Sequence, residues 1–214
     1  MKIKTLEFNP FGVNTYIVWN KDTLEAAVVD PGMSNQNECF RFKQFVEIER
    51  LQITKLINTH LHIDHTLGNE FVEATYGVSL MAHSDDAPLG AMRAQQAVMF
   101  NLRGVATDAV QIGTEIKAGD KIYLGDEYLE VLEVPGHSPG SIALYSPADG
   151  FVITGDALFR GSVGRTDLPG GNHSTLINSI KTHLMTLPSD TVVYPGHGPA
   201  TIIGQEAKTN PFIR

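Results

Sequence analysis

The stretch Thr59-His60-Leu61-His62-Ile63-Asp64-His65 decides the fold and the chemistry that we expect of this chain. It follows the apolar run 53–58 and holds potential metal ligands at positions 60, 62, 64 and 65. In extended backbone, residues 60, 62 and 64 point to the same side, and a turn at the strand end would bring residue 65 to join them. Asp64 could also cap a helix that begins there. Polar residues that merely end a strand seldom cluster in this way, so the pattern predicts a metal site.

Three further potential ligands stand at the ends of other β-type runs. His137 lies in the segment Pro-Gly-His-Ser-Pro-Gly (135–140), Asp156 follows Thr-Gly after the run 151–153, and His197 lies in Pro-Gly-His-Gly-Pro (195–199). Each has glycine beside it, which permits the close approach and unusual backbone angles that a ligand-bearing turn requires. Any one of them could be an ordinary turn residue. The repetition of one arrangement indicates that all three join the first cluster.

These residues amount to five histidines and two aspartates. Seven groups exceed the needs of one four-coordinate zinc, and they suit two ions that share a bridging carboxylate and leave one position open to water. A nitrogen and oxygen ligand set fits zinc, iron, manganese or cobalt, and the single cysteine excludes a thiolate site. A metal lowers the pKa of bound water from about 15.7 to about 7. The pattern therefore predicts hydrolysis by a metal-bridging hydroxide, and a slightly positive site that attracts an anionic substrate.

The rest of the chain predicts a mixed α/β fold. Its 214 residues suit a single domain spanning 1–214. Each predicted helix can bury only one face, so we expect a two-sheet core with the helices outside. We expect strands at 3–8, 13–19, 25–30, 53–58, 78–83, 121–124, 127–134, 141–146, 151–156 and 191–196. We expect helices at 35–51, 66–76, 88–102 and 175–187, and a short helix that ends before Pro211. Ser174 is the expected cap of the helix 175–187.

The composition excludes several classes of partner. Lys and Arg number 16 against 24 Asp and Glu, a formal charge of −8, which is unlike a protein that follows nucleic-acid phosphates. No run approaches the roughly 20 apolar residues that cross a bilayer. The N-terminus MKIKTLEFNP lacks the apolar stretch of a secretory signal. We therefore expect a cytoplasmic protein that binds neither nucleic acid nor membrane, and the oligomeric state stays open.

The ligand order resembles that of the metallo-β-lactamase superfamily over nearly the whole chain. The segments Gly-Asp-Ala-Leu-Phe (155–159) and Gly-Arg-Thr-Asp-Leu-Pro-Gly-Gly (164–171), and the ending PGHGPATIIGQEAKTNPF, resemble its glyoxalase II-like branch. The resemblance implies an αββα four-layer sandwich with two metal ions at one edge of the two sheets. Zinc is the metal that we expect, and iron and manganese are the alternatives.

The resemblance also implies a role for each site residue. The first ion would be bound by His60, His62 and His137, and the second by Asp64, His65 and His197, with Asp156 bridging the two. Asp64 and Asp156 would be the catalytic carboxylates. Arg165 would bind the substrate, a small anionic thioester or ester. The implied reaction is that of a thioesterase of the hydroxyacylglutathione hydrolase type.

Two features depart from the glyoxalase II pattern. Full-length enzymes carry a helical C-terminal domain that holds glutathione, whereas this sequence ends soon after His197, so we expect that domain to be absent. The family pocket also has a tyrosine two positions after its basic residue. Here Arg165 matches the basic residue, but Asp167 stands at the tyrosine position. Hydrolysis of a thioester or ester is expected, and glutathione as its thiol is left open.

Other readings of the same ligands stay open. The chain also resembles the persulfide dioxygenases of this superfamily, in which His60, His137 and Asp156 would form a facial triad on one iron. A lactonase would use the same hydroxide on an ester. A metal-binding module without turnover is the alternative that is not an enzyme.

Two further sequence features could serve either the site or the fold. Asp30, in an Asp-Pro-Gly turn, could support the metal loops or simply form the turn. Segment 85–115, with Met92, Met99 and Phe100, could form an adaptable apolar wall of the site or belong to the core.

Overall fold

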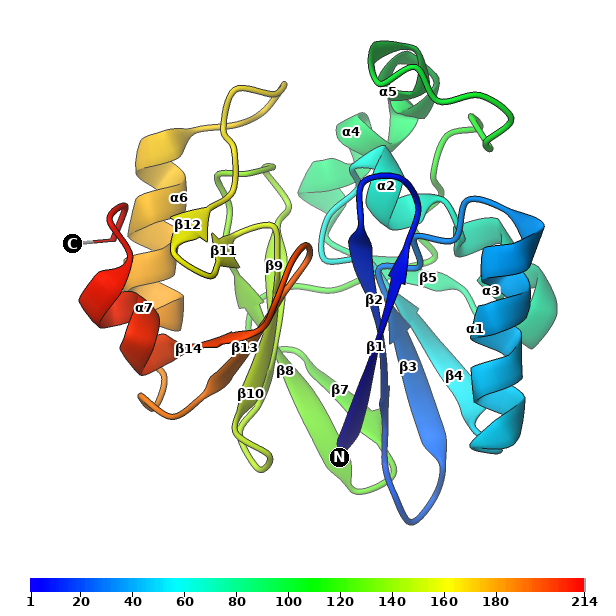
Figure 1. Cartoon of the computed structure of the whole chain (residues 1–214), viewed down its shortest axis with the longest axis horizontal. Coiled ribbons are helices and arrows are strands. Elements are labelled where there is room, and N and C mark those ends of the chain that lie inside the picture. Colours follow the sequence, from blue (N-terminus) through cyan, green and yellow to red (C-terminus); the bar gives the residue numbers. More distant parts are fainter. Residues whose placement is uncertain (214) are drawn as a thin grey trace.

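Two six-stranded sheets face each other at the centre of the protein, with helices on both outer sides (Figure 1). The computed structural model describes residues 1–213. Helices α1 (Gln36–Ile48) and α3 (Asn69–Tyr76) flank the first sheet, and α6 (His173–Ser179) and α7 (Ile203–Thr209) flank the second. This is the predicted αββα four-layer sandwich.

The first sheet has the strand order β1-β2-β3-β4-β5-β6. Its first three strands are antiparallel hairpin partners, whereas β3 to β6 run parallel. Parallel neighbours need a crossover, and α1 and α3 supply it between β3, β4 and β5. The strands are β1 (Lys2–Phe8), β2 (Val13–Trp19), β3 (Glu25–Val29), β4 (Gln52–Ile57), β5 (Leu80–Ala82) and β6 (Thr114–Glu115).

The second sheet has the order β14-β13-β10-β9-β8-β7. Only the pair β10 and β13 is parallel within it, and α6 with the following π-helical segment η2 (Ile180–Leu184) forms the crossover. Strands β11 (Leu158–Phe159) and β12 (Ser162–Val163) form a separate small hairpin. The strands of the second sheet are β7 (Lys121–Leu124), β8 (Glu127–Glu133), β9 (Ile142–Ser146), β10 (Phe151–Gly155), β13 (Val192–Pro195) and β14 (Thr201–Ile202).

Three apolar layers hold the sandwich together. Strand β2 is buried on both faces because alternate residues serve different layers: Ile17 packs with α1 residues such as Phe42, whereas Val18 faces the second sheet. Val152 in β10 likewise packs with Leu176 of α6 in the third layer. The burial of both sheets fixes the ends of β4, β8, β10 and β13, from which the ligand-bearing loops emerge.

The helices differ from the prediction mainly where they approach the ligand loops. The expected helix 66–76 begins later, as α3 with Gly68 as its N-cap residue, and a separate short helix α2 (Ile63–Thr66) precedes it. A side chain at position 68 would meet Met33 and the Pro31 carbonyl oxygen at 2.9 Å, so the chain turns where only glycine fits. The expected helix 88–102 was also wrong as one piece. Residues 88–102 fall into α4 (Ala87–Ala91), α5 (Arg93–Met99) and irregular chain, and the short helix η1 (Ser84–Asp86) precedes them.

Two predicted caps were wrong as well. Asp64 makes no cap, because α2 has His62 as its N-cap residue and no side-chain cap bond. The cap of α6 is Asn172, which accepts from the Thr175 amide, and not Ser174. Across residues 1–213, the helices are all too short or too polar to cross a bilayer.

Candidate metal centre

The first ligands follow β4 on a loop that changes conformation at residue 63. The chain is extended through His62 (φ −66°, ψ 146°) and then enters the helical turn α2. The prediction that residue 64 continues the extended run was therefore wrong. His60 and His62 leave the extended part, whereas Asp64 and His65 stand on the turn, and the two pairs reach different parts of the site.

Side chains from distant elements hold the backbone of this loop. The Leu61 amide donates to Asp86 (2.9 Å), and the Ile63 amide donates to the side-chain oxygen of Gln96 (2.9 Å). Asn58 donates to the His65 carbonyl oxygen (2.9 Å). Buried peptide groups need such partners, and these contacts set the direction in which the ligands project.

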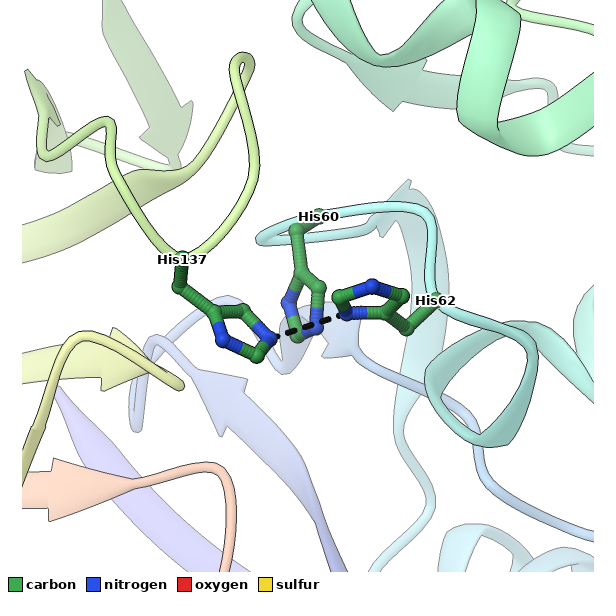
Figure 2. A group of neighbouring side chains, drawn as sticks. All are labelled: His60, His62 and His137. Atoms are coloured by element: carbon green, nitrogen blue, oxygen red, sulfur yellow. Dashed lines mark hydrogen bonds between the residues drawn. The ribbon is translucent and has the colours of Figure 1, made fainter. Parts of the chain in front are cut away.

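The first cluster comprises His60, His62 and His137 (Figure 2). His60 and His62 come from the loop after β4, and His137 comes from the β8–β9 connection. Nδ1 of His62 lies 2.9 Å from Nε2 of His137, and the three rings offer nitrogens within 4.8 Å of one another. Three ligands of a tetrahedral zinc at about 2.0–2.1 Å would stand roughly 3.3 Å apart, so this spacing suits one ion.

The second cluster comprises Asp64, His65 and His197. Nε2 of His197 lies 3.3 Å from both Oδ2 of Asp64 and Nε2 of His65, and these two partners are 3.7 Å apart. His197 reaches the cluster because its loop is joined to the first sheet: it forms a bridge with Val13, and the Asn14 side chain donates to the Gly198 carbonyl oxygen (2.8 Å).

Asp156 lies between the two clusters. Its Oδ2 is 3.6 Å from Nε2 of both His137 and His197, and its Oδ1 is 3.5 Å from Nε2 of His65. Gly196 makes room for it, because a Cβ at that position would stand 2.1 Å from Oδ1 of Asp156. One carboxylate thus faces ligands of both clusters.

Asp30 and its neighbour Thr59 hold two of the histidine rings in place by hydrogen bonds. Asp30 is fully buried, and its Oδ2 accepts from the Thr59 hydroxyl (2.6 Å) and from Nδ1–H of His65 (3.1 Å). The same hydroxyl accepts from Nδ1–H of His60 (3.1 Å). Asp30 holds this place with a left-handed backbone (φ +51°), a strained conformation for a residue other than glycine. Of the two roles left open for Asp30, the structure bears out support of the loops.

Carbonyl groups orient two further rings, those of His137 and His197. Nδ1–H of His137 donates to the Arg165 carbonyl oxygen (2.7 Å), and Nδ1–H of His197 donates to that of Phe11 (3.0 Å). These partners place the proton on Nδ1 and leave the Nε2 lone pair directed into the site, as metal-binding imidazoles require.

The two clusters differ in the charge that they hold without metal. Burial and the neighbouring His137 lower the pKa of His62 to about 3, and burial with His65 lowers the pKa of His60 well below its usual value. Burial also opposes a charge on His65, but the neighbouring Asp156 and Asp64 outweigh the effect of burial and raise the pKa of His65. For His197, burial is likewise outweighed by Asp64, which raises the pKa of that ring. His60 and His62 are thus neutral and ready to bind, whereas a metal must displace protons from His65 and His197.

The donor set fits a pair of divalent cations. Among the described residues, Nε2 of His60 and Oδ1 of Asp156 are buried without a hydrogen-bond partner. An unpaired buried polar atom is costly, and cations bound at the two clusters would satisfy these atoms. His65 holds the pKa of the buried Asp156 below its usual range, so this carboxylate is charged and able to coordinate.

Asp86 is the residue of this region that the sequence analysis missed. It is fully buried at the end of η1 and accepts from the Leu61 amide, the Ser138 hydroxyl (2.8 Å) and the Gly140 amide (2.6 Å). It therefore links the loop of His60 and His62 to the loop of His137. Burial raises its pKa despite these donors. The acidic pair at positions 85 and 86, shortly after the expected strand 78–83, was the only sequence signal here, and it does not indicate which amides the carboxylate would accept from.

Arg165 lines the pocket above the clusters, which has a volume of about 360 Å³, within the usual range for small-molecule sites. Its guanidinium is engaged by Asp167, with Nε to Oδ1 at 2.7 Å and Nη2 to Oδ2 at 2.8 Å. Both side chains are more than half exposed, so the pair contributes little to stability and can be exchanged for another partner. The remaining walls are apolar and include Phe11, Phe100 and Phe159.

A two-sheet sandwich with adjacent His and Asp clusters at its edge defines a metal-binding protein with an accessible site. A model of the family described as the metallo-beta-lactamase superfamily matches residues 8–197. The chain belongs to the metallo-beta-lactamase superfamily. Together with the clusters, this membership supports a metal-dependent hydrolase.

Individual relatives agree with this placement. The chain is 33% identical over 213 residues to the "Probable metallo-hydrolase YqgX" of Bacillus subtilis (strain 168), covering 100% of this chain and 98% of the relative. It is 34% identical to the "Hydroxyacylglutathione hydrolase GloC" of Haemophilus influenzae (strain ATCC 51907 / DSM 11121 / KW20 / Rd), again covering 100% and 98%. The crystal structure of TTHA1623 in a di-iron-bound form superposes with a TM-score of 0.85 at 34% identity, covering 98% of this chain and 99% of that one.

Proposed function

We propose that this protein is a dinuclear metal-dependent thioesterase of the hydroxyacylglutathione hydrolase (glyoxalase II) type, with zinc as its metal. The proposed ligands are those of the two clusters, His60, His62 and His137 for one ion and Asp64, His65 and His197 for the other, with Asp156 bridging them. The relative named as a hydroxyacylglutathione hydrolase supports the reaction class, and the relative solved with two irons supports the stoichiometry.

The observation that carries this proposal is the position of Asp156. A carboxylate whose oxygens lie 3.5–3.6 Å from ligands of both clusters can join two ions, which a site for a single metal does not require. When bound, two divalent ions would polarise the acyl oxygen and lower the pKa of a coordinated water to about 7.

The protein's own groups would then position the reactants. Asp64 is partly open to the pocket and is the proposed acceptor of the proton from the attacking water. Water adds to the acyl carbon, the carbon–sulfur bond breaks, and the products are a carboxylic acid and a thiol. Arg165, released from its exposed pair with Asp167, would hold an anionic group on the thiol side of the substrate.

The test combines metal analysis with turnover. We expect about two metal ions per chain, anaerobic hydrolysis of thioesters, and loss of nearly all activity in His137→Ala and Asp156→Ala. His183→Ala is the matched control, because His183 is exposed on η2 and should leave both quantities unchanged. Normal turnover of either site variant at unchanged metal content would refute the assignment.

Other outcomes point to the remaining functions. One iron per chain with oxygen uptake would favour a persulfide dioxygenase. Hydrolysis of lactones in place of thioesters would favour a lactonase, and metal binding with complete inactivity would favour a binding module.

A further inference from the structure

The pocket above the two clusters has one basic side chain in its wall. Among the described residues that line this pocket, Arg165 is the only Lys or Arg. The other titratable groups of the lining are proposed metal ligands, and the rest of the wall is apolar. An anionic group that a substrate carries away from the reacting carbonyl can therefore pair only with this guanidinium within the lining. The partner that Arg165 already has then decides how strongly the site can use the charge of a substrate.

Asp167 occupies one edge of the Arg165 guanidinium. Nε of Arg165 lies 2.7 Å from Oδ1 of Asp167 and Nη2 lies 2.8 Å from Oδ2, so two parallel hydrogen bonds join the groups. Arginine binds a free carboxylate in the same way, and a substrate carboxylate at this edge would compete with Asp167 for the same donors. The hydrogen bonds from Arg165 lower the pKa of Asp167 to about 2, so this competitor is charged at neutral pH.

The backbone on both sides of the pair is held in place. The Arg165 carbonyl oxygen accepts from Nδ1–H of His137 (2.7 Å). Beyond Asp167, the Gly171 amide donates to the Leu168 carbonyl oxygen (2.9 Å) and closes a turn. Because Asp167 stands two residues after Arg165 in this supported segment, its carboxylate stays near the guanidinium even when the hydrogen bonds between them break. A displaced Asp167 would therefore repel the anion that has taken its place.

We infer that Asp167 is a specificity-determining residue: it restrains Arg165, so that the site gains little from a negative charge on the thiol portion of a thioester. This inference rests on the proposed thioesterase function and deepens it. An anionic thiol portion must displace Asp167 and then lie beside its charge, whereas a neutral thiol portion leaves the pair intact. Asp167 thus acts on which thiol is accepted and not on the acyl chemistry.

The size of the effect follows from the exposure of the pair. The side chains of Arg165 and Asp167 are 55% and 69% exposed. Exposed ion pairs change an equilibrium constant by up to about fivefold, and bidentate pairs lie at the upper end of this range. Removing the charge of Asp167 should therefore increase the preference for an anionic thiol portion on the order of fivefold.

The experiment uses the whole metal-loaded chain and the acetyl thioesters of 3-mercaptopropionate and of 3-mercaptopropionamide, which have nearly the same shape and differ in charge. We expect Asp167→Asn to increase the anionic-to-neutral ratio of kcat/KM about fivefold. Asp190→Asn is the matched control, because it removes the same charge at an exposed residue that precedes β13 and does not line the pocket, and it should leave the ratio unchanged.

Two results would overturn the inference. If Asp167→Asn changes the ratio by less than twofold, Asp167 does not restrain Arg165. If Asp167→Asn decreases the ratio, the substrate uses the outer edge of the guanidinium while Asp167 stays in place and orients it.

A binding measurement tests the inference without turnover. The Nε–H resonance of Arg165 is followed in ¹⁵N-labelled protein during titration with 3-(methylthio)propionate and with its amide. We expect the carboxylate, and not the amide, to shift this resonance, and to bind Asp167→Asn about fivefold more tightly than the wild type. This pattern without hydrolysis of any thioester would refute the proposed function and keep the inference. Thioester hydrolysis with equal affinity of the two proteins for the carboxylate would refute the inference and keep the function.

Discussion

Replacing Asp86 with asparagine should loosen two ligand loops at once. The wild-type carboxylate accepts hydrogen bonds from Leu61, Ser138 and Gly140 at 2.6–2.9 Å, in a place without solvent exposure. Asparagine has nearly the same shape but turns one oxygen into an NH₂ donor. That NH₂ must face the Gly140 amide or the Leu61 amide, so one buried N–H loses its acceptor in either orientation.

The magnitude follows from these contacts. An unsatisfied buried N–H costs about 1–3 kcal/mol, and the remaining hydrogen bonds lose the extra strength that a charged acceptor gives. Asparagine avoids the burial of a charge, which offsets part of this loss. We therefore expect a decrease of about 2–3 kcal/mol in the free energy of unfolding, and a decrease of 10–100-fold in metal affinity because both loops carry ligands.

The assay is urea unfolding of chelator-treated protein, followed by metal titration. Measuring the metal-free protein first separates the loss of loop contacts from the loss of metal. Asp85→Asn is the matched control, since the same change is made one residue away at a side chain that is 66% exposed. If Asp86→Asn and Asp85→Asn agree within about 0.5 kcal/mol and bind metal equally, Asp86 does not position the loops.

Three further predictions concern the metal centre. In Gly196→Ala, the added Cβ would press on Asp156, so we expect the loss of at least one metal ion and a decrease of at least tenfold in kcat/KM. Gly198→Ala is the control: position 198 has φ +72° and open space around it, so this variant should lose about 1 kcal/mol of stability but keep its metal. Metal affinity should fall as pH decreases, because His65 and His197 have raised pKa values and protons then compete with the cation; a titration showing equal affinity at pH 5.5 and 8 would contradict this. Chelation should leave the far-UV circular dichroism unchanged while lowering the melting temperature, and unfolding on chelation would show that metal binding builds the fold.

The ligands were accessible from sequence because their residue types are unusual at strand ends. Histidine at three of six positions, and histidine or aspartate beside glycine in three later turns, have few structural explanations. The two-sheet architecture also followed from the strand and helix patterns. Helix α1 is one example: it was expected at 35–51 and lies at Gln36–Ile48 with Asn35 as its cap. The order of strands within each sheet did not follow, because periodicity does not specify which strands pair.

The supporting side chains were beyond the reach of sequence for a physical reason. Asp86 and Gln96 act on amides 25 and 33 positions earlier in the chain, and neither has a spacing or a residue type that marks such a contact. The break of the expected helix 88–102 has the same origin. The turn at Met92 lets Arg93 donate to the Thr66 carbonyl oxygen and lets Gln96 reach Ile63, so tertiary hydrogen bonds outweigh local helix preference.

These supports bear on which metals the centre accepts. The loop amides are paired with Asp86 and Gln96, and two ligand rings are anchored through Asp30 and Thr59, so protein contacts set the ligand positions. A site whose positions are set in this way does not need a particular ion to assemble it. With nitrogen and oxygen donors alone, zinc, iron and manganese can then compete on availability, and exchange of one for another should change turnover more than it changes structure.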